Sequence, residues 1–258
     1  MSEGSAKEGL PGAGEAGLAP RGASLRSFVA VPLPASVRAA ILAAVHATGH
    51  DTVPNAPSDA TTSLAARLPD IRWVRRPENL HVTLKFLGQV DGAKLARFTD
   101  ELAAALRKVA IPGFDIQLRG FGAFPSSRDA QVIWVGVDDP TQRLGQVAAI
   151  VDEVAARAPL QPDGYPTLPT LPALGKRPFR AHVTVGRAPR RSRRPRSGDA
   201  TAALAPAAEQ AFGRVAVSEI CIYESITGGE ASTYILRGKA TLEGAIHGDG
   251  QERDQGRN

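Results

Sequence analysis

"HVTLKFLG" at residues 81–88 returns in part as "HVTVGR" at residues 182–187. Both stretches alternate hydrophobic and polar residues, a pattern typical of a half-buried β-strand. Because side chains on a strand point alternately to its two faces, each copy presents a histidine and a threonine together. The chain has only five histidines among 258 residues, so the repeat indicates a functional pair.

The first copy is expected to turn one set of side chains to the core and the other away from it. Alternation places His81, Thr83 and Lys85 on the open face. The buried face is then expected to hold Leu80, Val82, Leu84 and Phe86.

The second copy follows the same pattern. His182 and Thr184 share its open face, and Val183 and Val185 are expected in the core. Arg187 falls on the side of Val183 if the strand extends that far. Strands hold reacting groups more accurately than loops do, which favours a site built on the two copies.

The elements around the repeat set the fold class. Patterns of period two predict strands over 25–34, 80–88, 114–124, 130–137, 181–187, 213–225 and 232–242. Helical spacing of apolar residues predicts helices over 35–49, 91–110 and 140–158. The late strands come as adjacent, hairpin-like pairs, so the order favours an α+β fold with antiparallel sheets.

The remaining segments are poor in residues that a core can use. We expect disordered tails over 1–24 and 246–258, with one folded domain at 25–245 between them. Polar, proline-rich or arginine-rich insertions are expected near 50–70, 160–178 and 188–210.

The composition limits the setting and the partners. A formal net charge of +5 suits a phosphate-bearing partner such as RNA. Six arginines fall within 187–196, which reads either as a solvated loop or as a surface for RNA backbone. No apolar run is long enough for a membrane span, and Cys221 is the single cysteine, so we expect a cytoplasmic protein without disulfides or a thiolate zinc site.

Two imidazoles on facing strands suit acid–base chemistry near neutral pH. One can take a proton from an attacking nucleophile while the other gives a proton to a leaving oxygen. The hydroxyls of Thr83 and Thr184 can donate hydrogen bonds to phosphate oxygens, where charge builds up in the transition state. A zinc site is the weaker reading, because neither tetrapeptide contains or adjoins a carboxylate. We therefore expect phosphodiester hydrolysis with no metal and no other cofactor.

The sequence resembles the 2H phosphoesterase superfamily, whose signature is a pair of His-x-Thr-hydrophobic motifs. It is most similar to bacterial and archaeal RNA 2′,3′-cyclic phosphodiesterases of the LigT-like kind, also called 2′-5′ RNA ligases. The resemblance is carried, in the family's order, by "RSFVAVPLP", "WVRRPENLHVTLKFLGQV", "FGAFPSSRDAQVIWVGV", "RPFRAHVTVGR", "ICIYES" and "YILRGKATL". These stretches cover most of residues 25–241.

The resemblance implies two similar lobes, each an antiparallel sheet backed by helices, around a central cleft. It also implies that His81 donates the proton to the departing 3′ oxygen and that His182 activates water. Thr83 and Thr184 would hold the phosphate. The product would be a 2′-phosphate, formed without a metal or nucleotide cofactor.

The expected partner is an RNA end that carries a 2′,3′-cyclic phosphate, tRNA fragments included. Lys85, Arg180 and Arg187 are candidate RNA contacts, because they share or bracket the motif strands. We expect no membrane partner and a monomeric protein.

Two other functions remain open at this point. The same chemistry run backwards would make the chain a 2′-5′ RNA ligase. A non-catalytic RNA-binding module, driven by the arginine-rich segment, belongs to a different class. Hydrolysis of a cyclic phosphate in the presence of a chelator separates the first function from the last.

Overall fold

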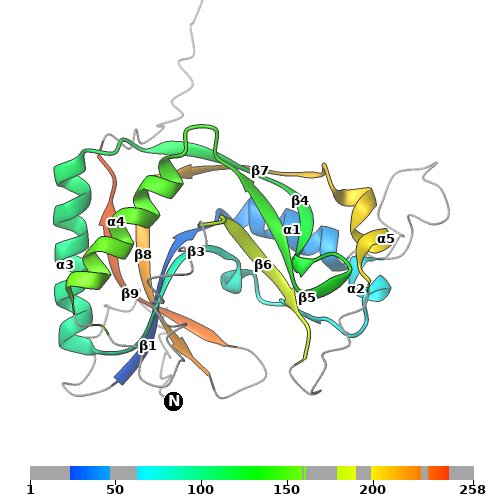
Figure 1. Ribbon diagram of the computed structural model, residues 1–258, viewed down its shortest axis with the longest axis horizontal. Helices are drawn as coiled ribbons and strands as arrows, with labels where there is room; N and C mark the ends of the chain where they lie inside the picture. Colours follow the sequence, from blue (N-terminus) through cyan, green and yellow to red (C-terminus); the bar gives the residue numbers. More distant parts are fainter. Residues whose placement is uncertain are drawn as a thin grey trace, which may run out of the picture.

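The computed structural model describes residues 24–46, 63–158, 160, 179–189, 199–227 and 232–243 (Figure 1). Apart from Ser24, both expected tails lie outside these residues. Of the expected insertions, the parts outside them are 50–62, 161–178 and 190–198.

Nine strands and five α-helices are present in the described part of the chain. The strands are β1 (Ser24–Pro32), β2 (Arg72–Trp73), β3 (His81–Asp91), β4 (Phe114–Ser126), β5 (Asp129–Asp138), β6 (His182–Arg187), β7 (Ala211–Val217), β8 (Glu219–Ile226) and β9 (Thr233–Thr241). The helices are α1 (Ala35–His46), α2 (Leu64–Arg67), α3 (Gly92–Val109), α4 (Arg143–Arg157) and α5 (Thr201–Leu204). Short 3₁₀ turns lie at Pro77–Asn79 and Ala205–Ala207.

All of the strand pairs within the sheet are antiparallel, so the expected α+β class is confirmed. The strand order is β7-β4-β5-β6-β3-β1-β8-β9, and β2 pairs with β6. A single residue pair, Val82 with Val183, joins β3 to β6 at the centre. The sheet therefore consists of two halves that meet at the strands carrying the repeated motifs.

Each half has its own helical cover. α3 and α4 lie side by side at one end of the molecule, over the half made of β3, β1, β8 and β9 (Figure 1). α1 packs against β7 in the other half. Among the helices that the structure describes, none combines the length and apolar character needed to cross a bilayer.

Helix α3 shows why the sequence forms these covers. Its buried residues recur at helical spacing, as the sequence predicted: Leu95, Phe98, Leu102 and Leu106. The side chain of Asp91 caps the first turn by accepting hydrogen bonds from the backbone N–H groups of Ala93 and Lys94. Ala110, in the left-handed region at φ 53°, ends the helix.

The prediction of one strand over 213–225 is wrong. The chain leaves β7 at Val217 and enters β8 at Glu219, and the two strands belong to different halves of the sheet. The burial pattern gives the reason, because the alternation of period two breaks between Val217 and Ile220, which are both buried. The expected late hairpin is present as β8 and β9.

Two short helices occupy the described ends of the segments predicted to be insertions. The Ser63 hydroxyl caps α2 by accepting from the backbone N–H of Ala66 at 3.1 Å, and Leu64 is buried behind it. In α5, Leu204 is buried in the same core cluster. Arg67 donates to the carbonyl of Ala202 at 3.1 Å, so the two segments contact each other.

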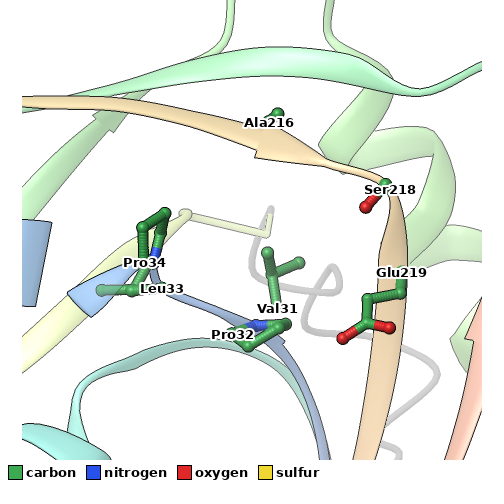
Figure 2. A pocket seen from close by; sticks show the side chains of 7 residues that line it. All are labelled: Val31, Pro32, Leu33, Pro34, Ala216, Ser218 and Glu219. Carbon is green, nitrogen blue, oxygen red and sulfur yellow. The ribbon is translucent and has the colours of Figure 1, made fainter. Parts of the chain in front are cut away.

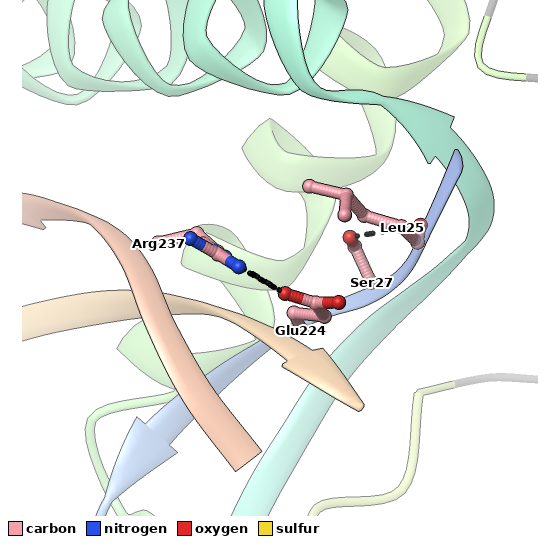
Figure 3. A network of polar contacts seen from close by, with 4 residues as sticks. All are labelled: Leu25, Ser27, Glu224 and Arg237. Atoms are coloured by element: carbon pink, nitrogen blue, oxygen red, sulfur yellow. Dashed lines mark hydrogen bonds and ion pairs between the residues drawn. The ribbon is translucent and has the colours of Figure 1, made fainter. Parts of the chain in front are cut away.

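A half-buried ion pair links β8 to β9 (Figure 3). Arg237 donates from Nε to Glu224 Oε2 at 2.8 Å, and the two side chains are only 20% and 13% exposed. Ser27 is buried beside it and donates to the carbonyl of Leu25 at 3.1 Å. This network ties the strands of one half together and includes no motif residue.

Candidate active site

The two motifs meet where β3 crosses β6. Val82 and Val183 pair directly, and both side chains are fully buried. Continuing that antiparallel register by one residue in each direction sets His81 opposite Thr184, and Thr83 opposite His182. All four side chains are therefore on the face opposite to the valines.

His81 lies in an aromatic environment. Its ring stacks on Phe28, with centroids 4.8 Å apart, and meets the edge of Tyr234 at 5.3 Å. Burial is the main cause that lowers the pKa of His81 to about 4. A backbone hydrogen bond at Asn79 raises it, and the charges of Arg187 and His182 lower it further. The imidazole of the free protein is thus neutral at pH 7.

His182 has a matching environment on the other strand. Nδ1 lies 2.7 Å from the carbonyl oxygen of Arg180, so the ring donates its Nδ1 proton there. The Nε2 lone pair of the neutral ring remains available as a base. Phe124 packs edge-on against the ring at 5.1 Å. Burial lowers the pKa of His182, and the cations of Arg187 and Arg180 act in the same direction.

A β-bulge in β6 brings Arg187 to the motif face. Ile133 pairs with Gly186 and Trp134 pairs with Thr184, so Val185 is an extra residue on β6. An extra residue reverses the alternation beyond it. Arg187 therefore lies on the face of the histidines, where its charge lowers the pKa of both. The prediction that it falls on the side of Val183 is wrong.

A second bulge, in β3, changes two predicted positions. Val29 pairs with Lys85 and Ala30 pairs with Thr83, so Leu84 is extra. Lys85 is turned to the helical side and forms an ion pair with Asp152 of α4 at 2.6 Å. The structure thus separates Lys85 from the other candidate RNA contacts.

Phe86 is turned the opposite way by the same bulge, and its predicted burial is wrong. Its side chain is 64% exposed, and its ring lies 6.1 Å from that of Phe28. Arg180, the remaining candidate contact, lies over the ring of Phe124 at 5.4 Å. The motif face therefore joins two histidines, two threonines and an arginine, with aromatic rings beside each histidine.

Sequence reasoning missed the aromatic neighbours of His81. Phe28 and Tyr234 come from β1 and β9, far from the motif in sequence, and only the strand order makes them neighbours. The sequence predicted both strands, at 25–34 and 232–242, but a local pattern does not indicate which strands pair with one another.

The pocket in Figure 2 lies between the end of β1 and the turn from β7 to β8. Its lining includes Pro32, which pairs with His81, but none of the motif residues. Glu219 points into the pocket and is held by Lys239 at 3.0 Å. Cys221, next to it, is buried, and burial raises the pKa of its thiol to about 11, so it is a poor nucleophile.

Metal ligands are sparse in the described residues. They contain no group of three or more histidine, cysteine, aspartate or glutamate side chains close enough to hold an ion. Around the two histidines, the charged side chains that act on them are the arginines already named. Such a site favours an anionic ligand.

Burial of His81 makes stability depend on pH. The folded state, with a pKa of about 4, binds fewer protons than the unfolded state at 6.5, so stability is lost as pH falls from 6.5 towards 4. The expected contribution of His81 is about 1 kcal/mol per pH unit in that window. Urea unfolding at several pH values gives the free energy of unfolding of the wild type and of His81→Asn. Between pH 4 and pH 6.5 this free energy should change less steeply with pH in the variant. An equal pH dependence of the two proteins in that window would contradict the burial of this imidazole. Between pH 7.5 and 8.5 the free energies of unfolding of the two proteins should change with pH to the same extent.

Comparison with known proteins gives a consistent picture. The family model described as LigT like Phosphoesterase matches residues 52–134. An RNA 2′,3′-cyclic phosphodiesterase of Archaeoglobus fulgidus is 31% identical over 158 residues, covering 61% of this chain and 77% of that protein. The protein of the same name in Escherichia coli is 30% identical over 160 residues, covering 62% and 70%.

Solved structures agree with the fold. LigT of E. coli, crystallised with 3′-AMP, superimposes with a TM-score of 0.54 at 26% identity, covering 85% of this chain and 99% of that one. The protein TT0787 of Thermus thermophilus gives a TM-score of 0.53 at 23% identity, over 85% and 99% of the two chains. The similarity to TT0787 concerns the fold alone.

Proposed function

This chain belongs to the LigT-like phosphoesterase family, and we propose that it hydrolyses the 2′,3′-cyclic phosphate at the end of an RNA to a 2′-phosphate. The observation that carries the proposal is the pairing of Val82 with Val183. That pairing supports a site in which one phosphate contacts both motifs, because one histidine and one threonine from each lie on the same face of the sheet.

The proposed reaction uses the two imidazoles in turn. His182, with its Nε2 lone pair available, takes a proton from water as the water oxygen attacks phosphorus. The bond between phosphorus and the 3′ oxygen breaks, and His81 gives its proton to that oxygen. The 2′ oxygen keeps the phosphate. Assignment of the acid to His81 follows the family resemblance.

His81 has to gain its proton although its pKa in the free protein is about 4. An anionic phosphate beside the ring favours the imidazolium and raises that pKa on binding. Thr83 and Thr184 would donate hydrogen bonds to the non-bridging oxygens, and Arg187 would neutralise the charge that develops there. Lys85 has no part in the proposal, because it is paired with Asp152.

The proposal is tested with a defined oligonucleotide that ends in a 2′,3′-cyclic phosphate, in the presence of EDTA. The expected product is the 2′-phosphomonoester, identified by ³¹P NMR, with the rate unchanged by the chelator. A 3′-phosphate would overturn the assigned leaving group. Binding without turnover would favour the RNA-binding module, and joining to an added 5′-hydroxyl oligonucleotide would favour the ligase.

A further inference from the structure

Strand β2 is fixed against the end of β6 in one register. Arg72 pairs with Arg187, and Trp73 pairs with Gly186. The backbone N–H of Val74 donates to the carbonyl of Val185 at 2.8 Å, which continues the ladder. Backbone pairing therefore holds Arg72 and Arg187 next to each other, whatever rotamers their side chains adopt.

Gly186 makes this close approach possible. A Cβ at this position would lie 2.5 Å from a methyl group of Ile71 and 2.9 Å from the ring of Trp73. The Trp73 indole is itself held by a hydrogen bond to the carbonyl of Leu68 at 3.3 Å. Because Trp73 packs on the core side of β6, its neighbour Arg72 is on the other face.

Arg72 and Arg187 are thus side by side on the face of the histidines, and both are exposed. Like charges directly opposite each other on a sheet are destabilising. Neither guanidinium has a carboxylate partner among the described residues, where carboxylates do pair with four other arginines: Arg119, Arg157, Arg214 and Arg237. Two adjacent guanidinium groups without an acid are suited to two successive phosphates of one RNA chain.

We propose that Arg72 binds the phosphodiester that precedes the terminal nucleotide of the RNA, beside Arg187 at the reacting phosphate. This inference rests on the proposed function and extends it to the chemistry of the substrate next to the reacting group. Arg187 is the inner member, since its charge reaches both imidazoles. Arg72 is one strand further out, where the next phosphate of the chain would lie. Guanidinium forks bind phosphate oxygens in pairs, which a lysine does not do.

The test compares three substrates with the same 2′,3′-cyclic end: adenosine cyclic phosphate, the ApA dinucleotide, and the dinucleotide with a neutral methylphosphonate linkage. For Arg72→Gln, the ratio of kcat/KM for the dinucleotide to that for the nucleoside should fall about tenfold, the loss of one charge-assisted hydrogen bond. The wild-type protein should lose the same preference with the methylphosphonate. In Arg72→Gln, the plot of log KM for the dinucleotide against log salt concentration should have a slope smaller by about 0.7 than in the wild type.

Lys94→Gln is the matched control, because Lys94 is an exposed cation at the start of α3. It should leave the substrate ratio at the wild-type value. An Arg72→Gln variant that lowers kcat/KM equally for nucleoside and dinucleotide, or for neither, overturns the proposal. If the wild-type protein hydrolyses no cyclic phosphate, the proposed function fails instead. The subsite is then judged by calorimetric binding of ApA 2′-phosphate, which Arg72→Gln should weaken about tenfold relative to adenosine 2′-phosphate.

Discussion

Replacing His81 or His182 with alanine is expected to lower kcat for a nucleoside 2′,3′-cyclic phosphate by roughly 10²–10⁴-fold in each case. In the proposed reaction each imidazole moves one of the two protons that are transferred. The losses should not add in the double variant, because either proton transfer alone is of little use without the other. Steady-state assays with the purified variants measure the effect.

The leaving group separates the two roles. Catechol cyclic phosphate loses a phenolate, which departs without a proton donor. His81→Ala should recover most of its loss on this substrate, whereas His182→Ala should stay impaired because water still has to be activated. The opposite pattern would exchange the roles of acid and base.

His46→Ala serves as the control for loss of an imidazole. His46 is in α1, contacts the carbonyl of Val74 at 3.0 Å and belongs to neither motif strand. Its variant should keep wild-type kcat. Full turnover in either motif variant would contradict acid–base catalysis at this face.

The second large effect is a fall of kcat/KM by about tenfold per pH unit between pH 7 and pH 9. Both imidazoles have lowered pKa values in the free protein, with His81 at about 4. The proposed reaction needs one ring protonated and the other neutral, and above pH 6.5 the singly protonated protein becomes steadily rarer. Because the two rings interact, the apparent pKa values belong to the pair.

The pH profile of kcat should differ from that of kcat/KM. A bound phosphate raises the pKa of the ring that carries the proton, so the alkaline limb of kcat is expected at higher pH. In His81→Ala, assayed with catechol cyclic phosphate, the alkaline limb should disappear. A flat kcat/KM between pH 7 and pH 9 in the wild type would show that the free protein needs no protonated histidine.

Much of the site followed from the sequence because period-two patterns are local. The motif histidines and threonines are on one face as alternation predicted, and the helix α3 has its predicted apolar stripe. Alternation failed where the strands carry an extra residue, at Leu84 and Val185. Each extra residue is defined only by the pairing with a neighbouring strand, which the local pattern does not contain.

The bulges also explain why the polar contacts of the site were predicted less well than its histidines. Because of the extra residue Leu84, Lys85 and Phe86 each lie on the face opposite to the predicted one. Arg187 does so because of Val185. Arg72 was not singled out at all, because a two-residue strand carries too little pattern to be recognised.

The most direct test of the central claim is an NMR titration of ¹⁵N-labelled imidazoles with and without adenosine 2′-phosphate. We predict that His81 and His182 both have pKa values below 6.5 in the free protein and that both values rise when the phosphate binds. A phosphate that shifts only one of the two rings would mean that they face different sites, and the proposed catalysis would be wrong.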